Sequence, residues 1–110
     1  MPHSAFYVLE KLTQAIYALA TGAGGVHERL SNAALYFWPA HPEDIPYEDL
    51  RRTFSGIRDD LHFEPAKGDE GRMAATLRIT SDEDAAAIAR RIVSLYLELN
   101  DRLRLDRKGG

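Results

Sequence analysis

The segment PYEDLRRTFSGIRDDL, residues 46–61, carries the clearest helix pattern in the chain. Its large apolar side chains recur in steps of three and four, which is the period of one face of an α-helix. This stripe consists of Tyr47, Leu50, Phe54, Ile57 and Leu61. Pro46 suits the first helical position, and Glu48 and Asp49 suit the positive end of the helix dipole. The segment is therefore predicted to be an amphipathic helix with one buried face.

Three other long segments show the same spacing. The first, residues 5–20, follows a potential N-cap at Ser4 and precedes Gly22, where a left-handed C-cap is expected. The second, residues 25–38, stops before Pro39, because a residue that precedes proline avoids helical angles. The last opens at Thr80, whose distance from Glu83 is that of a capping box. The expected stripes are Ala5, Leu9, Leu12, Ile16 and Leu19; Val26, Leu30, Ala33 and Phe37; and Ala85, Ile88, Ile92, Leu95 or Tyr96, Leu99 and Leu103.

These segments predict an all-α protein. A further apolar piece between Arg72 and Ile79 is long enough for two helical turns, and no stretch alternates apolar and polar residues as a strand does. Four long helices joined by short loops, plus one short helix across an end, indicate an antiparallel helical bundle. We expect one domain over residues 1–110, with residues 105–110 as a flexible tail.

Composition narrows the possible functions. The chain has 110 residues, no cysteine and a formal net charge of -3. Thiolate zinc sites, iron–sulfur clusters and cysteine nucleophiles are excluded, and we expect no cofactor. The mild acidity argues against DNA and anionic membranes as partners, because their binding needs excess Lys and Arg. No apolar run is long enough to span a membrane and the first residues lack a basic signal region, so a cytoplasmic location is expected.

Charge is distributed unevenly along the chain. Residues 1–42 contain only four charged side chains, Glu10, Lys11, Glu28 and Arg29. The first two predicted helices therefore lack a clearly polar side, and a single small core cannot enclose both of them. We predict an interface with another chain, most simply in a homodimer, formed by Tyr7, Tyr17, Tyr36, Phe37 and Trp38. The alternative is that the short helix and the loops cover this surface.

The segment Arg58-Asp59-Asp60-Leu61-His62 is the one candidate for catalysis. It resembles the Arg–polar–x–His signature of HEPN-type RNases, which are small, helical and commonly dimeric. The resemblance implies that Arg58 stabilises phosphate charge, that Asp59 is the polar residue after it, and that His62 is the acid–base group. Three residues separate Arg58 from His62, fewer than in that family. The alternative places the charged residues on a solvated helix face, where a protonated His62 would suit the helix C-terminus.

Other potential sites are weaker. Asp59 and His62 are spaced to share a helix face, but the sequence offers them no further ligand, so we predict no metal site. Residues 22–25, GAGG, form a helix–helix turn without the Lys-Ser/Thr of a phosphate-binding loop. The basic residues Arg90, Arg91, Arg102, Arg104, Arg107 and Lys108 alternate with acidic ones, which predicts an ion-paired, solvated face.

Three functions are consistent with these patterns. The first is a non-enzymatic interaction or accessory protein that self-associates through its first two helices or binds another protein there. The second is a HEPN-like, metal-independent RNase that uses Arg58 and His62, with RNA as its partner only in that case. The third is a carrier of a small apolar ligand, held in a pocket between helices.

Overall fold

The computed structural model describes residues 4–62 and 71–109, which form α-helices and one short 3-10 helix, with no strand among them. The long helices are α1 (Ala5–Thr21), α2 (Val26–Phe37), α3 (Glu48–Leu61) and α5 (Asp82–Gly109). The short helix α4 spans Arg72–Ile79, and the 3-10 helix η1 spans Pro42–Asp44. The prediction of an all-α protein with four long helices and one short helix is confirmed.

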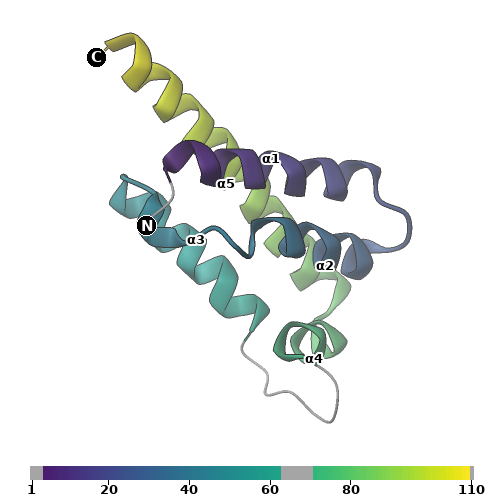
Figure 1. Cartoon of the computed structure of the whole chain (residues 1–110). Coiled ribbons are helices and arrows are strands. Elements are labelled where there is room, and N and C mark those ends of the chain that lie inside the picture. Colours follow the sequence, from purple (N-terminus) through teal and green to yellow (C-terminus); the bar gives the residue numbers. More distant parts are fainter. Residues whose placement is uncertain (1–3, 63–70, 110) are drawn as a thin grey trace.

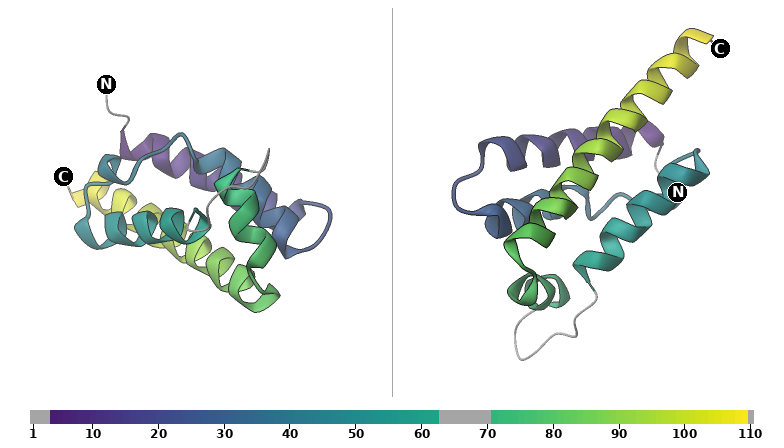
Figure 2. Two further views of the ribbon diagram at one scale, coloured as in Figure 1. Left: turned by 90° about the horizontal axis from the view of Figure 1, so that it is seen from below. Right: turned by 180° about the vertical axis from the view of Figure 1, so that it is seen from behind.

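The long helices form two antiparallel pairs (Figure 1). A short turn joins α1 to α2, and α3 lies antiparallel to α5 although α4 separates them in sequence. The two pairs cross obliquely, and α4 lies across one end against α2 and α3 (Figures 1 and 2). The molecule is elongated, 49 × 28 × 20 Å, because α5 extends past the other helices at its C-terminal end.

One continuous core holds the helices together. The predicted stripe of α3 is almost wholly buried, with Leu50, Phe54, Ile57 and Leu61 in the core. The stripe of α1 was predicted with a rotational error. Its fully buried residues are Val8, Leu12 and Ala15, whereas the other predicted members are only partly buried. Because α1 is apolar on nearly every side, its sequence does not specify which side faces the core.

The start of α1 agrees with the prediction, and the turn between α1 and α2 differs from it at one residue. The hydroxyl of Ser4 accepts a hydrogen bond from the Tyr7 amide at 3.3 Å, so the predicted N-cap of α1 is confirmed. Gly22 is not left-handed, since its φ is -66°. The positive φ of this turn, 88°, belongs to Gly24, where the chain reverses before α2. The prediction was wrong because the turn places its left-handed residue two positions later.

The starts of α3 and α5 also differ from the prediction. Pro46 lies outside α3, which begins at Glu48 after the N-cap residue Tyr47. The backbone of Tyr47 is extended, and its hydroxyl donates a hydrogen bond to Asp106. The capping residue of α5 is Ser81, whose hydroxyl accepts from the Asp84 amide at 3.0 Å, so the Thr80–Glu83 capping box was predicted one residue too early. The Thr80 hydroxyl instead donates to the Thr76 carbonyl in α4, at 2.6 Å.

The C-terminal end of α5 continues to Gly109, so helix extends through most of the segment 105–110 that was expected to be a tail. Within the described parts of the chain, no helix combines the length and apolarity that a membrane span requires.

Candidate functional site

Arg58, the predicted phosphate-binding residue, is directed toward backbone carbonyls at the end of α2. Its Nη1 donates to the carbonyl of Trp38 at 3.0 Å and to that of Ala40 at 2.9 Å. Its guanidinium also lies over the Trp38 ring, with Cζ 4.1 Å from the ring centroid. Burial lowers the pKa of Arg58, partly opposed by the charges of Glu43 and Asp59. Carbonyls at a helix C-terminus lack intrahelical donors, and Arg58 donates hydrogen bonds to the carbonyls at and just after the end of α2. It is therefore a helix cap and not a residue of a solvated face.

His62, the predicted acid–base residue, ends α3 as its C-cap. Its ring stacks on Trp38 with the centroids 4.3 Å apart. Its carbonyl accepts two hydrogen bonds from the Arg72 guanidinium, at 2.7 and 3.0 Å. Burial lowers the pKa of His62, and the positive charges of Arg72 and Arg58 lower it further. The neutral ring is therefore favoured, which corrects the expectation that a protonated His62 would balance the helix dipole.

The structure thus brings Arg58 and His62, one helical turn apart at the end of α3, together against one indole ring. Asp59, the third predicted residue, is exposed and stands beside them in sequence. No group of three or more metal-ligating side chains lies together among the described residues. The arrangement connects the end of α2, the loop after it and the end of α3, which is a structural connection between elements.

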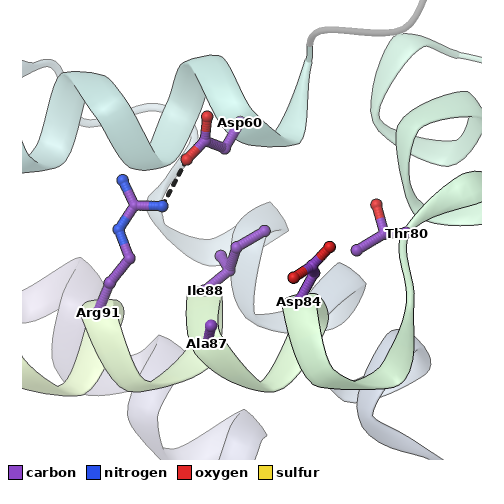
Figure 3. A pocket seen from close by; sticks show the side chains of 6 residues that line it. All are labelled: Asp60, Thr80, Asp84, Ala87, Ile88 and Arg91. Carbon is purple, nitrogen blue, oxygen red and sulfur yellow. Dashed lines mark hydrogen bonds and ion pairs between the residues drawn. The ribbon is translucent and has the colours of Figure 1, made fainter.

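A cleft of about 270 Å³ lies between α3 and α5 (Figure 3). Arg91 of α5 reaches across it to Asp60 of α3, with Nη1 2.5 Å from the carboxylate oxygen. Gly56 makes room for this side chain, since a Cβ there would lie 3.1 Å from an Arg91 nitrogen. Asp84 projects into the same cleft from the first turn of α5. The Arg91–Asp60 pair joins two helices, and the Thr80 hydroxyl in the lining donates its hydrogen bond to the Thr76 carbonyl.

The five predicted interface residues have different positions in the structure. Phe37 is fully buried and packs edge-on against Phe54, with the centroids 5.6 Å apart, so it has no surface to offer to another chain. Tyr7 and Trp38 are partly buried against the core. Tyr17 and Tyr36 are exposed, at 71% and 48%. The interface prediction was wrong for Phe37, because the predicted apolar stripe that it shares with Leu30 and Ala33 is the side of α2 that faces the core.

The exposed residues border a groove between α1 and α2 of about 550 Å³. Leu35, which is not among the predicted interface residues, is 63% exposed and lines this groove with the two tyrosines. Its position off the apolar stripe of α2 was the available signal. Among the residues that the structure describes, no charged side chain lines the groove; its walls are Gln14, Tyr17, Ala18, Thr21, Gly22, Asn32, Leu35 and Tyr36.

Comparisons with known proteins gave no match. No protein-family model matches the sequence, and no match was found among the curated proteins or the solved structures.

Proposed function

We propose that the protein is a non-enzymatic interaction module that self-associates through the outer face of α1 and α2. The observation that carries this proposal is the position of Tyr17, Leu35 and Tyr36 around an uncharged groove. Large, exposed apolar side chains grouped on one face are typical of interaction surfaces. Tyrosine enrichment with charge depletion is typical of the centre of such a surface.

A second copy of this chain is the partner that fits the groove best. The lining residues carry no charge, so the surface offers nothing that selects an acidic or basic partner. A two-fold axis brings the same patch of both molecules together, and the surface must then be complementary to itself. Tyr17 and Leu35 project beside the groove, so each copy supplies both the protruding side chains and the space that receives them. Gln14 and Asn32 supply neutral hydrogen-bonding groups on the same surface.

The proposal does not extend to RNA cleavage. An arginine that stabilises phosphate charge must present its guanidinium to the ligand, often with two parallel hydrogen bonds. Arg58 instead directs Nη1 to two backbone carbonyls and lays its guanidinium on Trp38. These contacts support a structural role for the segment that resembles the HEPN motif.

Sedimentation velocity on the full chain and two matched variants tests the proposal. Leu35→Glu places a carboxylate at the groove, and Leu105→Glu makes the same change at a residue of α5 with nearly equal exposure, 63% and 65%. We expect Leu35→Glu to shift the protein to monomer and Leu105→Glu to leave the dimer intact. Equal sedimentation of the two variants and the unmodified chain would overturn the assignment of the α1–α2 face.

A further inference from the structure

Another cleft, between the end of α1, the start of α2 and α5, combines an apolar wall with two arginines. Its volume is about 260 Å³. The apolar wall is formed by Leu19, Val26, Ala86, Ala89 and Val93. Arg29 of α2 and Arg90 of α5 complete the lining, and the cleft shares no residue with the groove proposed for self-association.

Arg29 is only partly satisfied by the protein. Its Nη1 donates to the Leu19 carbonyl near the end of α1, at 3.1 Å. Its Nε is buried and has no hydrogen-bond partner. Among the described residues it forms no ion pair with a carboxylate. Placing a guanidinium in a partly buried position without an anion costs free energy. An anion in the cleft would reduce this cost by compensating the charge, although the enclosed Nε itself is out of its reach.

Arg90 differs from the neighbouring arginines of its helix. Arg91 pairs with Asp60, Arg102 with Asp49 and Glu98, and Arg104 with Asp101. Arg90 is exposed and has no ion pair or hydrogen bond to a side chain in the described part of the chain. The sequence predicted an ion-paired face for these residues, and Arg90 departs from that pattern at the edge of the cleft.

The nearby carboxylates do not occupy this cleft. Glu28 precedes Arg29 but lines a different cleft, together with His27 and Ser31. Glu83 lies on α5 nearly two turns before Arg90 and is not among the lining residues. The two guanidiniums therefore give the cleft a positive edge beside its apolar wall.

We propose that this cleft binds a small carboxylate with a short aliphatic chain. The carboxylate would accept hydrogen bonds from Arg29 and Arg90, because guanidinium groups match carboxylate geometry. The chain would lie along Val26, Ala89 and Val93, where apolar contact excludes water. This site is independent of the proposed self-association, because a different face of the α1–α2 pair forms it.

Calorimetric titration of the full chain with sodium octanoate tests this site. The Arg90→Gln variant removes one guanidinium from an exposed position, and Arg104→Gln is the matched control on the same helix. We expect octanoate to bind, Arg90→Gln to weaken binding about tenfold, as the loss of a charge-assisted hydrogen bond does, and Arg104→Gln to leave it unchanged. Circular dichroism establishes that both variants are folded.

Further probes separate the two halves of the proposed recognition. Acetate, which lacks the chain, and octanol, which lacks the carboxylate, should each bind more weakly than octanoate. The Ala86→Glu variant, which adds a carboxylate to the wall, should abolish octanoate binding. Absence of octanoate binding to the unmodified chain, or equal binding by Arg90→Gln and Arg104→Gln, would overturn the proposal.

Discussion

The guanidinium of Arg58 lies on the indole ring of Trp38 and donates a hydrogen bond to the carbonyl of the same residue. A second hydrogen bond from the same nitrogen reaches the carbonyl of Ala40, so α3 holds the end of α2 and the first part of the following loop. Residues that a sequence motif associates with catalysis are here contacts between helices.

Replacing Arg58 should therefore destabilise the fold. We expect Arg58→Ala to lower the free energy of unfolding by about 2 kcal/mol, because two charge-assisted hydrogen bonds and the contact with Trp38 are lost. The control is Arg52→Ala, which removes an exposed pair with Glu48 within α3 and should cost less than about 0.5 kcal/mol. Urea denaturation measures both. Unchanged stability of Arg58→Ala, with loss of an RNA-cleaving activity, would instead support the HEPN-like function.

The lowered pKa of His62 predicts a pH dependence of stability. Its pKa in the folded chain lies below the ordinary value of 6.5, so the unfolded chain binds the proton more readily. The free energy of unfolding should then fall as the pH is lowered from 6.5 through the folded pKa. His62→Phe keeps a ring against Trp38 and removes the titration, so its stability should fall less over this range. If the stability of the unmodified chain and of His62→Phe fell equally with pH, His62 would not be the cause of the pH dependence.

The ion pair between Asp49 and Arg102 predicts that the stability of the fold also depends on pH in a more acidic range. Two hydrogen bonds of 2.6 and 2.7 Å from Arg102 hold the pKa of Asp49 below its ordinary value of 3.8. The pair therefore contributes stability at neutral pH that is lost as the pH falls below 3.8 through the lowered pKa. Asp49→Asn should be less stable than the unmodified chain at pH 7, and the difference should shrink with acidification. A difference that stays constant down to pH 3 would contradict this role.

The capping assignment at α5 can be tested by a pair of substitutions. Ser81→Ala removes the hydroxyl that accepts from the Asp84 amide, and should lower the free energy of unfolding by about 1 kcal/mol. Glu83→Ala should have a smaller effect, because the capping box predicted from the sequence does not form. Thermal unfolding of both variants provides the comparison, and a larger loss in Glu83→Ala would reverse the assignment.

Local patterns in the sequence were sufficient where one side of a helix was clearly polar. The bounds of α4 and the buried stripe of α3 agree with the prediction for this reason. In α1, where polar residues are few, the sequence did not show which apolar side chains face the core. In α2, by contrast, Leu30, Ala33 and Phe37 of the predicted stripe are all buried. Phe37 was nevertheless included in the predicted interface, whereas the exposed Leu35 was not.

The surroundings of the candidate sites depend on contacts between distant segments. The carbonyls that Arg58 contacts belong to the end of α2 and to the loop, and no spacing within α3 indicates them. Likewise, Arg29 and Arg90 come from different helices and meet at one cleft only after α5 packs beside α2. Motif spacing reports local geometry, whereas the partners of these side chains follow from packing.

Self-association through the α1–α2 face predicts that the mass of the unmodified chain in solution rises with its concentration. Light scattering coupled to gel filtration, over a range of protein concentrations, should give twice the chain mass of 12.3 kDa at the higher concentrations. A mass of 12.3 kDa at every concentration would contradict the proposed self-association.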